Sequence, residues 1–176
     1  MSQDITDFIA AVRDAARGNK FEVVITWPTA VGSPSLQDKM VIRAASMPAY
    51  TTGVLNLPYM GRQIPIPGDR TYEPWTCTVL NDISMSHRNR FEKWQDLING
   101  QQSNLQGTTS YKELVTTIEI IQYDRNDNIL AVKTLNNAWP SNVSAIELAY
   151  DQNDQEQTYT VTFVFTDAQN AAAPTT

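Results

Sequence analysis

Hydrophobic residues at the start of the chain recur every three or four positions, which is the spacing of an amphipathic helix. These positions are Ile5, Phe8, Ile9, Val12 and Ala16. Ser2 can cap the start of such a helix, and Gly18 stands where a left-handed terminating residue is favoured. We therefore expect a short N-terminal helix whose apolar stripe packs against another element.

Alternation of apolar and polar residues predicts β-strands over much of the remaining chain. The predicted strands cover 21–27, 40–44, 75–79, 115–123, 129–135, 146–150 and 157–165. The polar turn 124–128 joins two of them into a hairpin, and Trp139-Pro140 is expected to end that hairpin. In the last strand apolar residues alternate with threonines, and a threonine face suits contact with water better than a dry core.

A second helix is predicted between two of these strands. Phe91, Trp94, Leu97 and Ile98 share one helical face. We expect Ser86 to cap the start of this helix and a glycine at position 100 to end it.

The segment 48–67 combines apolar residues with prolines. The apolar residues are Leu55, Leu57, Tyr59, Met60, Ile64 and Ile66, and the prolines are Pro58, Pro65 and Pro67. Proline cannot donate a hydrogen bond to a sheet, so these positions fit an edge or an extended arm rather than a central strand. Two interpretations stay open: an edge hairpin folded onto its own core, or an arm that buries its apolar residues on a neighbouring subunit.

The length of 176 residues fits one mainly β (α+β) domain, which we place at residues 1–167 with a disordered tail over 168–176. No apolar run approaches the length of a membrane span, and no basic region precedes an apolar core at the N-terminus, so we expect neither membrane insertion nor a secretory signal. The formal charge is −6. That sign opposes tight binding to nucleic acid, although it suits a surface past which DNA slides without sticking.

Residues able to support catalysis or metal binding are scarce. His87 is the only histidine, and its place at a helix start suggests an exposed residue rather than a general base. Cys77 lies in a strand and is expected to be a small buried apolar residue. Asp124, Asn126 and Asn128 match the first positions of an EF-hand loop, but the glycine and the final glutamate are missing, so a solvated turn is expected. We predict no enzyme activity, no metal and no cofactor.

Two blocks of residues resemble the tail tube proteins of contractile-tailed bacteriophages. The first is Gly68-Asp69-Arg70-Thr71-Tyr72 followed by Trp75, and the second is Trp139-Pro140-Ser141-Asn142-Val143. The order and spacing of weaker matches follow that family from the N-terminal helix to about residue 166. The longer loop around 32–37 and the Ala/Pro/Thr tail depart from it.

The resemblance implies an antiparallel β-sandwich or barrel-like subunit with flanking helices, similar to the tubes of bacteriocins and type VI secretion systems. It implies hexameric rings stacked into an inner tail tube through which DNA is ejected. The implied partners are further copies of the chain, the tail sheath protein, the baseplate initiator, the tail terminator, the tape-measure protein in the lumen, and DNA that passes without specific binding. The implied location is the virion tail, with assembly in the host cytoplasm.

Within this interpretation, segment 48–67 becomes a candidate contact between subunits, and the threonine-bearing strand 157–165 becomes a candidate lining of the lumen. The candidate contact residues are Leu55, Leu57, Tyr59, Met60, Arg62, Ile64, Asp69 and Arg70. For Arg70 we expect an acidic partner, either across a subunit contact or within the subunit. The alternatives are a monomeric β-sandwich that binds a ligand or carbohydrate on Trp27 or Trp139, and a tube subunit of a phage-derived injection device.

Overall fold

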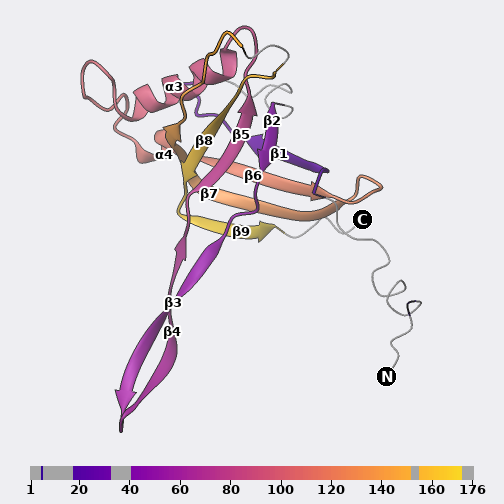
Figure 1. Ribbon diagram of the computed structural model, residues 1–176. Helices are drawn as coiled ribbons and strands as arrows, with labels where there is room; N and C mark the ends of the chain where they lie inside the picture. Colours follow the sequence, from indigo (N-terminus) through magenta and orange to yellow (C-terminus); the bar gives the residue numbers. More distant parts are fainter. Residues whose placement is uncertain (1–4, 6–17, 33–40, 152–154, 172–176) are drawn as a thin grey trace.

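The computed structural model describes residues 5, 18–32, 41–151 and 155–171 (Figure 1). The predicted N-terminal helix, apart from Ile5, lies outside these residues. So do most of the longer loop around 32–37 and the end of the expected tail, 172–176.

Strands dominate the described part of the chain, which confirms the mainly β class. The first strands are β1 (Phe21–Ile25), β2 (Ile42–Ala45), β3 (Tyr50–Tyr59), β4 (Arg62–Tyr72) and β5 (Trp75–Leu80). Helices α3 (Ser86–Ile98) and α4 (Tyr111–Leu114) follow. The chain continues with β6 (Thr116–Tyr123), β7 (Ile129–Val143), β8 (Thr158–Val164) and β9 (Asp167–Ala171).

Seven strands form one sheet in the order β1-β6-β7-β8-β5-β2, with β9 also paired to β7. The sheet folds over at β7, because this strand pairs with β6 and β9 along its first half and with β8 along its second half. We call the two layers sheet A (β1, β6, β9 and the start of β7) and sheet B (β2, β5, β8 and the end of β7). All pairings in both layers are antiparallel, as expected for a β-sandwich.

The hairpin of β6 and β7 ends at Ala138, directly before Trp139-Pro140 as expected, but β7 itself continues through both residues to Val143 and pairs there with β8. Near this change of partner, Asn137 has a positive φ of 53°. Asparagine tolerates this left-handed geometry better than most residues do. Pro140 lies opposite Phe163 just before a register shift in the pairing with β8, and a bulge is one of the places where a sheet accepts proline.

Two predictions fail because the availability of strand edges decides which segments pair. Residues 146–150 form no strand, because β8 is already paired with β5 on one side and β7 on the other. Residues 168–171 are not a disordered tail, because they belong to β9 and pair with β7 residues 132–135. The alternating strand at 157–165 is confirmed as β8, with Tyr159, Val161 and Phe163 buried.

An aromatic cluster fills the space between the two layers and α3. Phe163 lies near its centre, with its ring centroid 6.0 Å from that of Phe91 and 6.2 Å from that of Trp94. Trp27 contacts both of these α3 residues, at 4.9 and 5.8 Å. The Trp94 indole N–H also donates to the Leu114 carbonyl at 2.7 Å, which satisfies its only donor inside the core. The predicted apolar face of the second helix is therefore confirmed, and it closes the sandwich.

The cap of α3 differs from the prediction. Ser86 is the first residue of the helix rather than its acceptor, and its backbone N–H donates to Asp82 Oδ1 at 3.0 Å. The hydroxyls of Ser84 and Ser86 also donate to the Asp82 carboxylate. These hydrogen bonds, with that of Ser84 the largest cause, lower the pKa of Asp82 below its ordinary value.

We expect Asp82→Ala to reduce the free energy of unfolding by about 1 kcal/mol, because a helix start loses its side-chain acceptor. The pKa of Asp82 is lowered on folding, so this stabilisation is present above the unfolded pKa of about 3.9 and is lost as the pH falls through the folded value. Urea unfolding at neutral and acid pH measures both effects. Asp96→Ala, at an exposed position on α3, is the matched control; an equal effect of the two changes at neutral pH would contradict the assignment.

Candidate subunit interface

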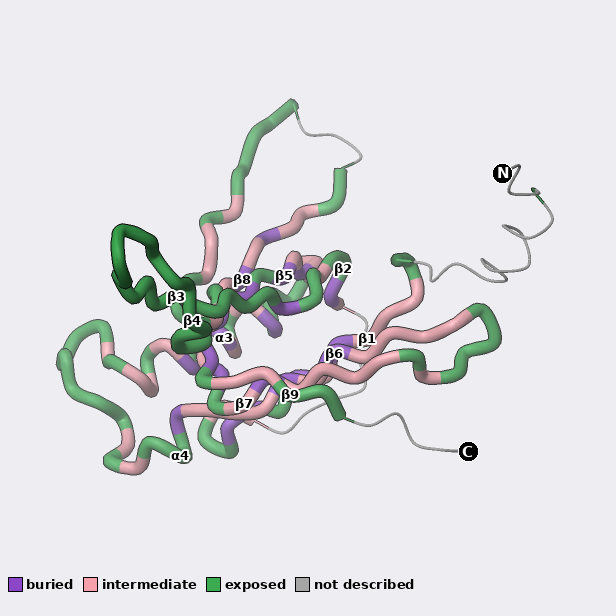
Figure 2. The backbone as a smooth tube through the Cα atoms, turned by 90° about the horizontal axis from the view of Figure 1, so that it is seen from below, coloured by how far each residue is buried: buried purple, intermediate pink, exposed green. Residues whose placement is uncertain are grey.

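Strands β3 and β4 form an antiparallel hairpin that extends away from the sandwich (Figure 1). We call this hairpin, residues 50–72, the arm. It is inserted between β2 and β5, which pair with each other in sheet B, so both of its strands leave the body from one sheet edge. Every residue of the arm except Tyr72 is exposed (Figure 2).

The tip of the arm is a two-residue turn formed by Met60 and Gly61. Both have positive φ, 44° and 79°, which is the geometry of a type I′ hairpin turn. Tyr59 and Arg62 face each other across this turn. The turn type and the loop length define which residues of a hairpin pair with each other. The two turn residues therefore determine the register of the whole arm.

One face of the arm is aliphatic along most of its length. Leu55 pairs with Ile66, and Leu57 pairs with Ile64, so these side chains lie on the same face as the Tyr59–Arg62 pair. The side chains are exposed, by 56% for Leu55, 45% for Leu57 and 49% for Ile64. The interpretation of 48–67 as a hairpin folded onto its own core is therefore wrong.

The prolines lie on the opposite face, at Pro58, Pro65 and Pro67. In a hairpin with a two-residue loop, the pair flanking the turn is hydrogen-bonded, and the pairs alternate from there. Pro58 and Pro65 are in pairs 58–63 and 56–65, and Pro67 is in pair 54–67. All three thus stand where a backbone N–H would point outward, away from the partner strand. The prolines remove donors from the outer edges and disfavour the addition of another strand there.

The base of the arm is fixed by aromatic and cationic contacts. Tyr72 lies 5.5 Å from Phe165 at the end of the core and 6.4 Å from Tyr50. The Arg70 guanidinium lies 4.7 Å from the centre of the Tyr50 ring, and the Lys133 amine lies 6.0 Å from it. These contacts connect the arm to both sheets and orient it relative to the body.

The structure brings Leu55, Leu57, Tyr59, Arg62 and Ile64 together on the aliphatic face, with Met60 at the tip. Asp69 and Arg70 lie apart from them near the base. Ile66 belongs to the face although it is absent from the predicted contact set; its alternation with Ile64 is the signal that identifies it. The acidic partner expected for Arg70 within the subunit is not present among the described residues, and a partner in another subunit stays a prediction.

A second exposed surface is the outer face of sheet B, which carries uncharged hydroxyl groups. Thr78 lies opposite Thr160, and Thr76 lies opposite Thr162, with their hydroxyl oxygens 3.2 Å apart. Asn142 extends this face on β7, beside Thr162. The prediction that the second face of β8 contacts water rather than a dry core fits this position.

The candidates for chemistry are accounted for by packing and turns. His87 is buried, with 7% of its surface exposed, so its predicted exposure is wrong; it lies in the first turn of α3, whose buried face packs into the core. Cys77 is buried as expected, and burial raises the pKa of its thiol to about 12. Trp27 is buried and Trp139 packs partly against the core, so neither offers the exposed platform of the ligand-binding alternative.

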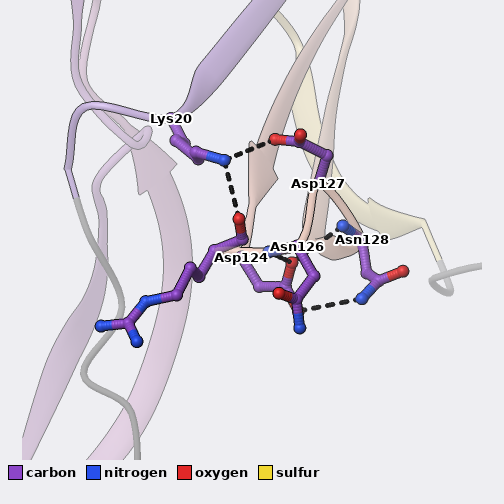
Figure 3. A network of polar contacts seen from close by, with 6 residues as sticks. Lys20, Asp124, Asn126, Asp127 and Asn128 are labelled. Atoms are coloured by element: carbon purple, nitrogen blue, oxygen red, sulfur yellow. Dashed lines mark hydrogen bonds and ion pairs between the residues drawn. The ribbon is translucent and has the colours of Figure 1, made fainter.

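The turn with EF-hand-like residues is held by its own hydrogen bonds (Figure 3). Asp124 Oδ1 accepts the backbone N–H groups of Asn126 and Asn128 at 2.7 and 2.8 Å. The Asn128 side-chain amide donates to Asp124 Oδ2 at 3.1 Å, and this bond is the largest cause that lowers the Asp124 pKa, followed by the backbone N–H of Asn128. Lys20 donates to Asp127 at 2.6 Å. Among the described residues, no group of His, Cys, Asp and Glu side chains is arranged to hold a metal ion. No helix in the described part of the chain is long and apolar enough to cross a bilayer.

The comparisons with known proteins agree with this arrangement. The family model "Phage tail tube protein" matches residues 16–168. The chain belongs to the phage tail tube protein family. It is 31% identical over 150 residues to tail tube protein gp19 of Enterobacteria phage T4, covering 85% of this chain and 88% of that protein. It is 30% identical over 146 residues to the tail tube protein of Serratia phage KSP90, covering 82% of each.

Solved structures of contractile injection systems share the fold of this family member. A chain of the anti-feeding prophage baseplate aligns with a TM-score of 0.66 at 11% identity, covering 92% of this chain and 99% of that one. A chain of the sheath–tube complex of an extracellular contractile injection system, in its extended state, aligns with a TM-score of 0.61 at 15% identity. The latter match covers 95% of this chain and 97% of that chain. The predicted tube-like sandwich fold is thereby confirmed.

The arm residues should contribute little to the stability of the isolated subunit. We expect Leu57→Asp to change the free energy of unfolding by less than about 0.5 kcal/mol, because the side chain is already exposed. Leu135→Ala, at a fully buried position, should cost about 2–5 kcal/mol. Urea unfolding of the monomer, followed by tryptophan fluorescence, compares the two. A large loss in Leu57→Asp would show that the arm belongs to the subunit's own core.

Proposed function

We propose that this chain is the structural subunit of an inner tail tube, in which hexameric rings stack around a lumen that conducts DNA into the host. The exposed aliphatic face of the arm is the observation that carries the proposal beyond family membership. A two-stranded hairpin standing alone is marginally stable in water. Burial of this face on another copy stabilises the hairpin and removes the apolar surface from solvent at the same time.

In the proposed tube, each candidate interface residue has a contact with another copy of the chain. The aliphatic face, Met60 at the tip and Arg62 beside it contact neighbouring subunits. Asp69 and Arg70, near the base, contact charged groups where the arm leaves the body. Because the contact joins different surfaces of identical chains, repetition along an axis produces an open-ended stack rather than a closed dimer.

The outer face of sheet B is our candidate for the lumen lining. Its threonine hydroxyls offer no positive charge to phosphate groups, and the chain as a whole carries a formal charge of −6. DNA binding depends on the release of counterions when Lys and Arg neutralise phosphates, so a lining dominated by hydroxyl groups holds DNA only weakly. Arg43 on β2, the exposed basic residue of sheet B, is already paired with Glu156 at 3.2 Å. Such a lining lets DNA slide during ejection.

The wider assembly follows from the proposed tube. Tail sheath surrounds it, a baseplate initiator starts it, a tail terminator ends it, and a tape-measure protein occupies its lumen before DNA does. Subunits assemble in the host cytoplasm and function in the virion. The shared fold with chains of contractile injection systems supports one alternative, a tube subunit in a phage-derived device of that kind.

Deletion of Leu55–Ile64 should abolish tubes and leave a soluble, folded subunit, because the deleted residues are exposed and contribute no side chain to the core. Negative-stain microscopy scores tubes, and circular dichroism scores the fold. A double change on the other face of the arm, Asn56→Ser with Gln63→Ser, is the matched control and should retain tubes. Normal tubes after the deletion would refute the role of the arm.

Lysines placed in the proposed lumen should convert the tube into a DNA-binding surface. Thr76→Lys with Thr162→Lys adds two positive charges at facing positions of sheet B. Asp96→Lys changes the charge by the same amount on α3. We expect only the double threonine variant to retain short duplex DNA on sedimented tubes, with an affinity that falls steeply as salt rises. Equal retention by both variants would place sheet B outside the lumen.

A further inference from the structure

We propose that the tip of the arm docks into a specific groove on the next copy of the chain, formed by residues 144–150 and the start of β8. This inference rests on the proposed tube function and names the surface that receives the arm. The occupant is a second copy, and the contact is directed from the arm of one subunit to the opposite end of its neighbour.

The groove has a volume of about 1020 Å³. One wall is the irregular segment Ser144–Tyr150, and the other is 155–160. The Ser144 backbone is held on β8 by its N–H, which donates to the Thr160 carbonyl at 2.8 Å, and Arg88 donates to the Ser144 carbonyl at 3.0 Å. The groove thus has one wall fixed to sheet B and α3.

Large apolar side chains stand exposed on this wall. Leu148 is 82% exposed and Tyr150 is fully exposed, at 107%. Both line the groove. Isolated apolar residues on a surface are ordinary, but here they border a concave site of a size that accepts side chains from a hairpin tip. They match the aliphatic character of Leu57 and Ile64 on the arm.

The charges of the two surfaces are complementary. Arg62 is the only charged residue between Tyr50 and Gly68. Among the described residues, the charged side chains that line the groove are Glu147 and Glu156, with Arg43 and Arg88 in contact with its walls. Glu156 already pairs with Arg43 at 3.2 Å, whereas no ion pair joins Glu147 to any basic side chain of the described residues. Glu147 is therefore the carboxylate available to the arginine beside the arm tip.

The placement of the two surfaces suits head-to-tail association. The arm projects from one end of the molecule, and the segment 144–150 lies at the other end (Figure 1). Ten residues of extended chain on each side give the arm a reach of about 33 Å, at roughly 3.3 Å per residue. A contact between opposite ends of parallel copies is heterologous, and it continues along an axis when the rotation between copies does not close a ring.

Disulfide trapping between two single-cysteine variants tests the contact directly. Met60→Cys marks the arm tip, and Leu148→Cys marks the groove. Leu130→Cys, at a 46% exposed site on β7, is the matched control for the groove position. The native Cys77 is buried, with 1% of its surface exposed, and does not compete under mild oxidation.

We expect the Met60→Cys and Leu148→Cys proteins to cross-link about a hundred-fold faster than the Met60→Cys and Leu130→Cys proteins, because docking raises the effective concentration of the thiols. Equal rates in a mixture that forms tubes would overturn the docking proposal and leave the tube function standing. Wild-type protein that forms no tubes, even with its initiator, would overturn both.

A charge exchange identifies the proposed ionic contact. Arg62→Glu should weaken assembly about ten-fold, as a like-charge pair forms with Glu147, and Glu147→Arg in the same chain should restore it. Glu113→Arg, on α4 away from the groove, is the control second change and should not restore assembly. The critical concentration for tube formation measures each variant. Rescue by Glu113→Arg as strong as that by Glu147→Arg would refute the assigned pair.

Discussion

Strand β7 is hydrogen-bonded to β6 and β9 along its first half and to β8 along its second half. This one strand therefore determines where sheet A ends and sheet B begins. Asn137, with its positive φ, lies near this change of partner, and the aromatic cluster around Phe163 fills the space between the layers. Because β2 and β5 pair at the edge of sheet B, the arm inserted between them leaves the body from a fixed position.

Local periodicity predicted much of this fold. Strand β8 and the buried face of α3 follow directly from alternation and from the spacing of Phe91 and Trp94. Competition between strands is not visible in such patterns. Pro140 looks like the end of a strand until its opposite residue, Phe163, is known, and 146–150 alternates correctly but finds no free edge. These outcomes depend on which distant segments pair with β7 and β8.

In the candidate interface, too, the sequence predicted some features and left others to the structure. Apolar residues interrupted by prolines were sufficient to identify the arm as a separate feature, but both interpretations of it stayed open, since burial on its own core or on another copy requires the same side chains. Register groups Leu55, Leu57, Ile64 and Ile66 on one exposed face, which excludes burial on the subunit's own core, while contact with another copy stays a proposal. The groove near Leu148 gave no signal of its own, because its walls come from irregular chain and from a strand that pairs elsewhere.

The outward-facing prolines of the arm also bear on the period before assembly. A virion component accumulates as many free copies, and an apolar hairpin with open edges is a template for cross-β aggregation in such a crowded pool. Pro58, Pro65 and Pro67 interrupt that template without covering the aliphatic face. Fibril growth by edge pairing is thereby slowed, while side-chain docking remains possible. In the proposed tube, the prolines favour docking of side chains between copies over cross-β pairing of the arm edges.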